Sequence, residues 1–298
     1  MNDKPLLFSI IIPAYNRAAF LPVAIQSVLN QNYEKWELII VNDGSTDDTE
    51  KVLQSYNDSR IKHITIVNSE RGAARNRGIA LATGNFISFL DSDDQLLPNH
   101  FEEAATFIRK NENANVFHLG YKIVKENGIM SFASHKLSLH LNFELKQNNV
   151  ISPNGIFLKA EVAKQNLFSE DRILAGTEDY ELWLRLATQF TIFHHPVITS
   201  MLIDHPQRSM NENDFQKIEK RILLFLEYVN LNSEVRSWMG NRLNRFVSYR
   251  FSYLSLHAAL VNNKKAAYAY LWKALKKYPL LIFSKRFAVI LKRIFNSG

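Results

Sequence analysis

Three carboxylates lie close together in Asp91-Ser92-Asp93-Asp94, directly after the apolar residues 86–90. Carboxylates crowded at the end of a buried strand repel one another and lose hydration, and a bound divalent cation relieves both penalties. Ligands of open α/β sheets bind at the carboxyl ends of strands, so such a cation would hold a phosphate-bearing substrate. The alternative is a solvated acidic turn that caps the next helix. That alternative suits an isolated Asp-x-Asp, and the other loops decide between the two.

Three further loops carry polar residues that folding does not require. They are Pro13-Ala14-Tyr15-Asn16-Arg17, Asn42-Asp43-Gly44-Ser45-Thr46-Asp47 and Arg71-Gly72-Ala73-Ala74-Arg75-Asn76-Arg77-Gly78. These loops carry aromatic, carboxylate and guanidinium groups, and the guanidinium groups suit a phosphate-bearing substrate.

The elements that must position these loops alternate along the first half of the chain. Three apolar runs predict buried strands, at residues 8–12, 36–41 and 86–90, and the alternating residues 61–67 predict a further strand. The first is expected to end at Pro13. Apolar residues recur at helical spacing over residues 20–29 and 73–82, and Ser45 with Asp48 predicts a capping box for the helix between them. The βαβαβαβ order predicts an α/β fold with a Rossmann-like, mostly parallel sheet and helices on both faces.

The second half of the chain is less regular. Its predicted helices are residues 98–110, 161–165 and 179–188, and its predicted strands are residues 116–124 and one or two strands within 191–203. Residues 125–150 are polar and predict a hairpin or a flexible loop. From Asp214 onward the pattern is helical throughout, so we expect a domain boundary near residue 212.

The ordered set of loops resembles a family 2 glycosyltransferase of the GT-A fold, an enzyme that uses a nucleotide-diphospho-sugar. The resemblance covers roughly residues 7–205. One loop alone is weak support, whereas the ordered set at these spacings is specific. The resemblance implies a catalytic domain over residues 1–212, with a nucleotide-sugar half (1–97) and an acceptor half (98–212). A basic helical region, residues 213–298, follows.

The resemblance assigns donor contacts to the first two loops. Pro13, Tyr15 and Asn16 are expected to contact the donor, with Tyr15 either lining the base pocket or standing as an ordinary half-exposed tyrosine. Asp43 is expected to accept a hydrogen bond from a base imide N–H. An Asx-turn before Gly44 is compatible with that role.

The third loop supplies positive charge. Arg71 and Arg75 are candidates for contacts with the donor phosphates or base. Arg75 with Asn76 matches the Ala-Arg-Asn usual in the family, whereas Arg71 stands where relatives often carry a smaller residue. Arg77 is expected to face solvent.

The resemblance also implies a metal site. Asp93 is expected to be the metal ligand proper, Asp91 to reach the ribose or the metal, and Ser92 to join the donor contacts. Mn²⁺ or Mg²⁺ suits a site that combines one or two carboxylates with phosphate oxygens. His205 stands where relatives often carry a histidine, although Asp204 replaces their common arginine. His205 is expected to contact the metal or the pyrophosphate, or to be a plain loop histidine.

Three further residues are expected to support the residues that contact the donor and the metal: Asp94, Glu178 and Arg208. Asp94 has the alternative role of a further metal ligand, and Arg208 the alternative of serving the phosphates directly. Glu178-Asp179 at the start of a predicted helix matches the Glu-Asp motif of the family. The resemblance implies that Asp179 is the general base that deprotonates the acceptor hydroxyl, with inversion at the anomeric carbon. Taken alone, the same pair is the acidic first turn that a helix dipole favours.

Composition sets limits on the whole chain. Its 298 residues are 46% hydrophobic and include no cysteine, which excludes disulfides, thiolate metal sites and cysteine nucleophiles. The N-terminus has no signal-peptide pattern, and no apolar stretch approaches the ~20 residues of a membrane-spanning helix. We therefore expect a cytoplasmic protein.

The net charge of +7 comes from the tail. Residues 235–298 hold 13 Lys and Arg and no Asp or Glu, so the first 234 residues carry −6. An apolar stripe with flanking lysines is expected on these helices, at Tyr268, Leu271, Trp272, Leu275, Tyr278 and Leu281, and again at Phe287, Ile290, Leu291, Ile294 and Phe295. Such helices suit peripheral contact with an anionic membrane on its inner face. The alternative is a stripe that packs on the catalytic domain. Nucleic acid is not expected as a partner, because no motif supports it.

The expected function is therefore transfer of a sugar, a UDP-sugar being the expected donor, to a hydroxyl of a glycan or lipid-linked saccharide, as in cell-surface polysaccharide synthesis. One alternative is a metal-dependent nucleotidyltransferase, which would want a glycine-rich basic loop after the first strand that Pro13-Ala14-Tyr15-Asn16 does not provide. The other is a non-catalytic sugar- or lipid-binding protein, which the presence of Asp43, Asp93 and Asp179 disfavours.

Overall fold

The computed structural model of the protein describes residues 6–125, 127–206 and 214–296. The chain divides into two compact units, Met1–Arg208 and Ser209–Gly298, which are described separately. The boundary expected near residue 212 lies outside the described residues.

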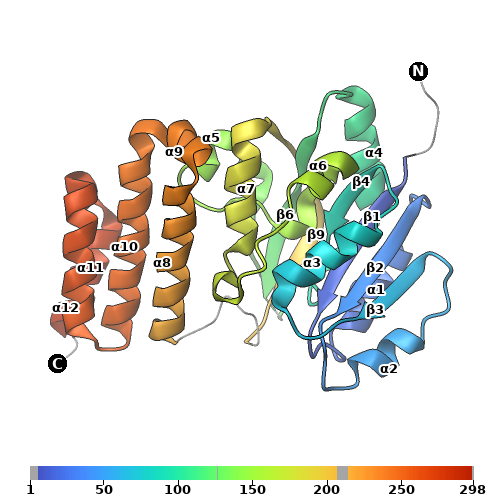
Figure 1. Cartoon of the computed structure of the whole chain (residues 1–298), viewed down its shortest axis with the longest axis horizontal. Helices are drawn as coiled ribbons and strands as arrows, with labels where there is room; N and C mark the ends of the chain where they lie inside the picture. Colours follow the sequence, from blue (N-terminus) through green and yellow to red (C-terminus); the bar gives the residue numbers. More distant parts are fainter. Residues whose placement is uncertain (1–5, 126, 207–213, 297–298) are drawn as a thin grey trace. The chain divides into compact units, whose positions relative to one another are not determined.

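The N-terminal unit is built on one nine-stranded sheet (Figure 1). Its strands are β1 (Phe8–Ala14), β2 (Trp36–Asn42), β3 (Ile61–Thr65), β4 (Phe86–Phe89), β5 (Gln95–Leu96), β6 (Val116–Lys125), β7 (Met130–Ala133), β8 (Ile156–Lys159) and β9 (Ile192–Asp204). The order across the sheet is β3-β2-β1-β4-β8-β6-β9-β5, with β7 paired to β6. Strands β3, β2, β1 and β4 are parallel, so the loops that follow them meet at one edge.

Helices cover both faces of this sheet, as expected for the α/β class, which is confirmed. The helices of this unit are α1 (Leu21–Leu29), α2 (Thr49–Gln54), α3 (Glu70–Leu81), α4 (His100–Lys110), α5 (Asn142–Leu145), α6 (Ala160–Gln165) and α7 (Glu178–Gln189).

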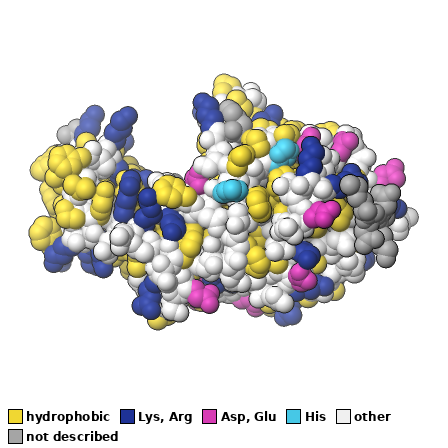
Figure 2. All heavy atoms as spheres, turned by 90° about the horizontal axis from the view of Figure 1, so that it is seen from above, with side chains coloured by type: hydrophobic (Ala, Val, Ile, Leu, Met, Phe, Trp, Pro, Cys, Tyr) yellow, Lys and Arg dark blue, Asp and Glu magenta, His cyan; other side chains and the backbone are white. Residues whose placement is uncertain are grey.

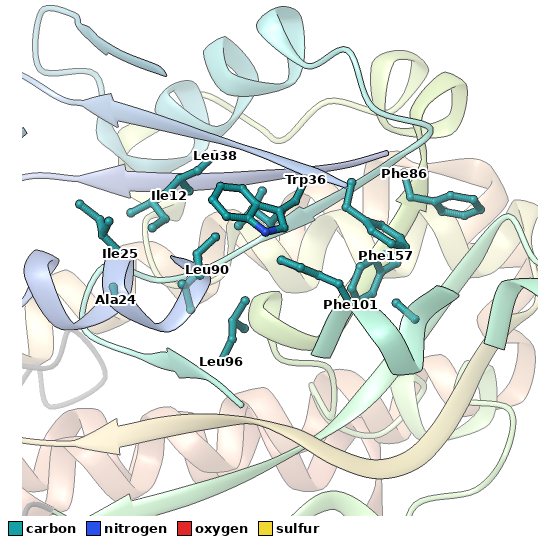
Figure 3. Close-up of a cluster of buried hydrophobic side chains, with 14 of the residues drawn as sticks. Ile12, Ala24, Ile25, Trp36, Leu38, Phe86, Leu90, Leu96, Phe101 and Phe157 are labelled. Carbon is teal, nitrogen blue, oxygen red and sulfur yellow. The ribbon is translucent and has the colours of Figure 1, made fainter. Parts of the chain in front are cut away.

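Successive side chains of a strand point to opposite faces of the sheet. Ile10 and Ile12 of β1 join a buried cluster that contains residues of α1 and α4, among them Ile25 and Phe101 (Figure 3). Ile11 points the other way, onto α3.

The contact between Ile11 and α3 requires a glycine. A Cβ at Gly78 would lie 2.4 Å from Cγ2 of Ile11. Any side chain at Gly78 would therefore push α3 away from β1. This close approach fixes the helix that carries Arg75 against the sheet.

Two local expectations about the first loops were wrong. Strand β1 does not stop at Pro13 but continues to Ala14, with Pro13 paired in register to Val41. Ser45 does not cap α2, because its hydroxyl accepts a hydrogen bond from the backbone N–H of Asn16 at 2.9 Å. The side chain that was expected to start a helix instead ties two loops together.

Two short strands complete the sheet beyond those expected. β8 lies between β4 and β6 and is antiparallel to both, and β5 pairs with β9. The polar segment after residue 125 forms a hairpin through β7, as one of the two alternatives predicted. The expected strand or strands within 191–203 are one strand, β9, which runs parallel to β6.

Strands β6 and β9 carry two buried histidines side by side. Nδ1 of His118 lies 3.2 Å from Nδ1 of His194, and Nε2 of His118 accepts a hydrogen bond from the backbone N–H of Ser152 at 3.2 Å. Nε2 of His194 lies 3.2 Å from the carbonyl oxygen of Ser134. Two neutral imidazole rings account for these hydrogen bonds, with the proton of His118 on Nδ1 and that of His194 on Nε2. Burial lowers the pKa of both rings.

The C-terminal unit is helical throughout its described part, as expected. Its α-helices are α8 (Phe215–Leu231), α9 (Ser233–Met239), α10 (Leu243–Leu260), α11 (Lys264–Lys277) and α12 (Lys285–Asn296), with a 3₁₀ helix, Pro279–Phe283, before α12. The expected apolar stripe divides: Leu271, Leu281 and Ile290 are buried within the unit, whereas Trp272 and Phe295 are exposed. None of the helices among the residues that the structure describes is both long and apolar enough to cross a membrane.

Candidate active site

A buried arginine joins the acidic loop after β4 to the first turn of α7. Arg75, on α3, is 1% exposed. Its guanidinium donates to Oδ1 of Asp91 at 2.8 Å and to Oε1 of Glu178 at 2.7 Å. Because burying a guanidinium is costly unless it is paired, these two charge-assisted hydrogen bonds hold the two acidic segments on one cation. All three residues are among those predicted from the sequence, and the structure brings them together. Contact of Arg75 with a donor remains a prediction.

Asp179 lies next to this group without sharing the arginine. Its half-buried carboxylate accepts a hydrogen bond from Nδ2 of Asn149 at 3.0 Å. The pKa of Asp179 is raised to about 7, chiefly by burial and also by the negative charge of Glu178, while the positive charge of Arg75 opposes both. A carboxyl group with such a pKa can accept a proton near neutral pH.

The expected metal ligands Asp93 and His205 also meet. Nε2 of His205 lies 3.0 Å from Oδ2 of Asp93. The imidazole is buried and stacks on Phe20, with ring centroids 4.7 Å apart. Phe20 thereby fixes the ring that faces Asp93.

This pair fits a divalent cation that takes its other ligands from a substrate. Mg²⁺ and Mn²⁺ in nucleotide sites are commonly bound by one or two protein groups together with phosphate oxygens. A carboxylate and an imidazole within hydrogen-bonding distance provide such a partial set. Within residues 6–125, 127–206 and 214–296, no three His, Asp or Glu side chains are grouped so that they could hold a metal alone. The fit therefore depends on oxygen atoms from a ligand.

Asp94 points away from that pair and into the protein. It is almost fully buried, and its two carboxylate oxygens accept hydrogen bonds from Nδ2 of Asn154 and from the backbone N–H of Ile203, at 2.7 and 2.8 Å. Ser92, next in the loop, is also buried. The expected contact of Ser92 with the donor remains a prediction.

The first two loops are connected by Asn16, which has a positive φ of 51°. Its side-chain oxygen accepts a hydrogen bond from the backbone N–H of Thr46 at 2.8 Å. Tyr15, directly before it, is 46% exposed, and Pro13 is half-buried in β1. Of these three expected donor contacts, Tyr15 is the one whose side chain is open to solvent.

Asp43 lies at the N-terminus of α3. Its carboxylate accepts hydrogen bonds from the backbone N–H groups of Ser69 and Glu70, at 2.7 and 2.9 Å. Burial raises the pKa of Asp43. The expected contact with a base remains a prediction, and the structure adds a role in fixing the start of the helix that carries Arg75.

Three arginines complete the expected set. Nε of Arg71 lies 3.8 Å from Oε1 of Glu178, and about a third of the Arg71 side chain is exposed. Arg77 is exposed, as expected. Arg208 lies outside the described residues.

Three residues around the site were not expected from the sequence: Phe20, Asn149 and Asn154. Asn149 and Asn154 fall in a segment whose pattern predicts no regular element, and Phe20 was placed in the apolar face of a helix. The turn composition of Ser152-Pro153-Asn154-Gly155 was the available signal for Asn154. It indicates a turn, and it does not say which carboxylate the amide would reach.

Parallel strands whose loops gather acidic and basic side chains at one edge are typical of α/β proteins that bind a ligand at the carboxyl ends of the strands. Residues 9–163, over half of the chain, match the family described as glycosyl transferase family 2. The chain belongs to that family, as the resemblance implied.

Several curated relatives are similar to this chain. An uncharacterized glycosyltransferase of Rickettsia bellii is 33% identical over 61% of this chain, and the match spans 26% of that relative's length. An Escherichia coli protein named UDP-Glc:alpha-D-GlcNAc-diphosphoundecaprenol beta-1,3-glucosyltransferase is 34% identical over 60% of this chain and 69% of its own. A Campylobacter jejuni protein named GalNAc(5)-diNAcBac-PP-undecaprenol beta-1,3-glucosyltransferase is 27% identical over 90% of this chain and 87% of its own.

Solved structures share the fold over nearly the whole chain. Staphylococcus aureus TarS 1–349 in complex with UDP-GlcNAc aligns with a TM-score of 0.71 and 19% identity, over 98% of this chain and 89% of TarS. A mannosyltransferase from Pyrobaculum calidifontis, in complex with GDP-Man and Mn²⁺, aligns with a TM-score of 0.60 and 15% identity, over 99% of this chain and 89% of its own. The expected GT-A fold with a C-terminal helical region is thus confirmed.

Proposed function

We propose that this protein is an inverting glycosyltransferase. It transfers a sugar from a nucleotide-diphospho-sugar, a UDP-sugar, to a hydroxyl of a glycan or a lipid-linked saccharide. Family membership supports the reaction class. The names of the E. coli and C. jejuni relatives support a lipid-linked acceptor, and the UDP-GlcNAc complex of TarS supports the donor class.

One observation carries the proposal: the placement of Asp179 beside the pair formed by Arg75 and Glu178. Arg75 connects the Glu178-Asp179 motif to Asp91 of the acidic loop, so the two halves of the expected site are held by one side chain. The raised pKa of Asp179, about 7, suits a residue that takes a proton from an acceptor hydroxyl. A packing role alone would not require an aspartate with a raised pKa at this position.

The proposed reaction is a single displacement. Asp179 accepts the proton of the acceptor hydroxyl while the hydroxyl oxygen forms a bond to the anomeric carbon of the donor sugar. The bond from that carbon to the diphosphate oxygen breaks, and its electron pair leaves with the nucleoside diphosphate. Because the acceptor attacks from the face opposite the leaving group, the configuration at the anomeric carbon inverts.

Asp93 and His205 would hold Mn²⁺ or Mg²⁺ together with oxygens of the donor diphosphate. When bound, the cation would stabilise the negative charge on the departing nucleoside diphosphate. Phe20 orients the imidazole of this pair by stacking on it, and Arg75 holds Asp91, two residues before Asp93.

Thermal melting with and without ligands tests this proposal. UDP and UDP-sugars should raise the melting temperature of the wild-type protein in the presence of Mn²⁺, and less so without it. Asp93→Ala should lose the Mn²⁺-dependent part of the increase. Asp48→Ala, which removes an exposed carboxylate that pairs with Lys51, serves as the matched control and should retain it. An equal increase for Asp93→Ala and wild type would remove the metal assignment.

We also propose that the C-terminal unit places the protein at the inner, anionic face of a membrane. Several of its large apolar side chains are exposed: Tyr268, Trp272, Leu280, Ile282, Phe283, Val289 and Phe295. Figure 2 shows hydrophobic side chains next to Lys and Arg side chains on this unit. Residues 235–298 have no acidic side chain, so the charge complements an anionic lipid surface.

Vesicle sedimentation tests the membrane contact. Point variants are preferable to deletion, because residues of α11 such as Ala267 and Leu271 are buried within the unit. Replacing Trp272 and Phe283, which are 61% and 80% exposed, with serine should weaken binding to phosphatidylserine vesicles at least about tenfold. Leu231→Ser, at another exposed apolar residue, is the control. Equal binding of the double variant and the control, or equal binding to neutral vesicles, would contradict the proposal.

A further inference from the structure

A fully buried amide connects the acidic loop to the segment before β8. Oδ1 of Asn154 accepts a hydrogen bond from the backbone N–H of Asp91 at 2.9 Å, and its Nδ2 donates to Oδ2 of Asp94 at 2.7 Å. The amide therefore binds the first and the last residue of Asp91-Ser92-Asp93-Asp94. Asparagine has both a donor and an acceptor at the end of its side chain, and both are used here.

Asp94 extends this connection to the end of β9. Its Oδ1 accepts the backbone N–H of Ile203 at 2.8 Å, two residues before His205. A continuous chain of hydrogen bonds thus runs from Asn154 through Asp94 to the segment that presents the imidazole. Asp93 and His205, which face each other at 3.0 Å, are on the two segments that this chain joins.

The backbone around Asn154 is itself held closely. Its N–H donates to the hydroxyl of Ser152 at 3.2 Å in a short 3₁₀ helix, Pro153–Gly155. A Cβ at Gly155 would lie 2.4 Å from the carbonyl oxygen of Leu119, so the chain can pass here only with glycine. These restraints fix the position from which the Asn154 amide reaches the loop.

We infer that Asn154 and Asp94 are positioning residues that set the separation between Asp93 and His205. They would act through those two side chains, without touching donor or cation, and so preorganise the subsite for a divalent cation and a nucleoside diphosphate. The inference rests on the proposed function. It assigns Asp94 to this internal role in place of the ligand role that the sequence left open.

An exchange of the two side chains tests the inference. In Asp94→Asn, the new NH₂ group faces either the NH₂ group of Asn154 or the backbone N–H of Ile203. Two donors then oppose each other, so one hydrogen bond is lost. In Asn154→Asp, two carboxylate oxygens face each other at hydrogen-bonding distance, and neither carries a proton to donate. In the double variant Asp94→Asn/Asn154→Asp, the three hydrogen bonds to Asp91, between the two side chains and to Ile203 are restored with the central donor and acceptor reversed, and the net charge is unchanged.

The probes are UDP and Mn²⁺, titrated together by calorimetry well below the melting temperature, and Mn²⁺ alone by electron paramagnetic resonance. Each single variant should weaken Mn²⁺-dependent UDP binding about tenfold or more, and the double variant should return to within about threefold of wild type. In turnover assays the singles should raise the donor KM more than they lower kcat.

Asn142→Asp is the matched control for general loss of stability. The side chain of Asn142, on α5, donates to the carbonyls of Ala187 and Phe190 and accepts from the N–H of Ile192. This variant should lower the melting temperature and leave UDP affinity unchanged.

Unchanged affinity in both singles, or a double variant as weak as the weaker single, would overturn the inference. Failure of the wild-type protein to bind UDP would instead overturn the proposed function. In that case Mn²⁺ binding and the melting temperatures of the wild type, the two single variants and the double variant still decide the inference. Restoration in the double variant supports it, and additive losses contradict it.

Discussion

The acidic loop after β4 and the acidic first turn of α7 surround their carboxylates differently. In the loop, Asp91 and Asp94 each accept a hydrogen bond at 2.7–2.8 Å, from Arg75 and from Asn154. In the first turn of α7, Glu178 accepts a hydrogen bond from the same arginine, Arg75. Asp179 instead accepts one from the neutral amide of Asn149 and lies beside the negative charge of Glu178. The difference supports the proposed division of labour: the carboxylates bound by Arg75 and Asn154 hold geometry, and Asp179 has the raised pKa that the proposed proton transfer needs.

Asp179→Asn should have the largest effect of the variants proposed here, and it acts on the catalytic rate. The amide keeps the size of the side chain and cannot accept the proton of the acceptor, so kcat should fall by about 10²–10⁴-fold. UDP affinity should be unchanged, because no donor contact is expected of Asp179. Turnover and calorimetry on the same preparation check both statements, and a fully active variant would exclude Asp179 as the base.

Arg75→Met should have the next largest effect, on stability. It leaves the carboxylates of Asp91 and Glu178 without the buried cation that they share, and removing one partner of a buried pair costs about 3–5 kcal/mol. Urea unfolding monitored by tryptophan fluorescence measures the change. Arg77→Met, on the exposed side of the same helix, is the control and should cost much less.

The pH dependence of transfer sharpens the comparison. With a pKa of about 7, Asp179 is protonated in acid and cannot act as a base, so kcat/KM should fall as the pH drops below about 7. Glu178→Gln removes the negative neighbour, which stabilises the charged form of Asp179 and should move the acid limb to lower pH, by on the order of one unit. Glu161→Gln, at an exposed residue of α6, should not move it. An acid limb that stays in place in Glu178→Gln would show that another group titrates.

Arg71→Ala should have the smallest effect on stability. The Arg71–Glu178 contact is long, at 3.8 Å, and partly exposed, so its loss should cost less than about 1 kcal/mol. UDP affinity then decides the expected role of Arg71. A several-fold loss supports a phosphate contact, and unchanged affinity argues against it.

The sequence allowed the parallel half of the sheet and its loops to be predicted, because buried parallel strands are short apolar runs and their carboxyl ends meet at one edge. The contacts between side chains that lie far apart in the sequence could not be predicted from it. Arg75 and Glu178 are separated by 103 positions and Asp94 and Asn154 by 60, and no local pattern encodes such contacts. Strand β8 was missed for a related reason, because four residues are too few to show a period.

The tail shows a second limit of periodicity. An apolar stripe reports that a helix has an apolar face, and it does not say what covers that face. Leu271 and Trp272 are adjacent and both apolar, yet one is buried within the C-terminal unit and the other is 61% exposed. Periodicity therefore does not separate the covered from the exposed side chains, and packing on the catalytic domain and contact with a membrane both stay predictions.

The buried histidines of β6 and β9 have a consequence for acid tolerance. In the unfolded chain His118 and His194 take up protons below about pH 6.5, whereas burial lowers the pKa of both rings in the folded protein. The unfolded state therefore binds more protons as the pH falls, and the free energy of unfolding decreases with it. His100, whose pKa burial lowers to about 3, adds a third such proton. Mild acidification should thus lower the free energy of unfolding of the N-terminal unit, with these three rings contributing an uptake of up to three protons per molecule unfolded.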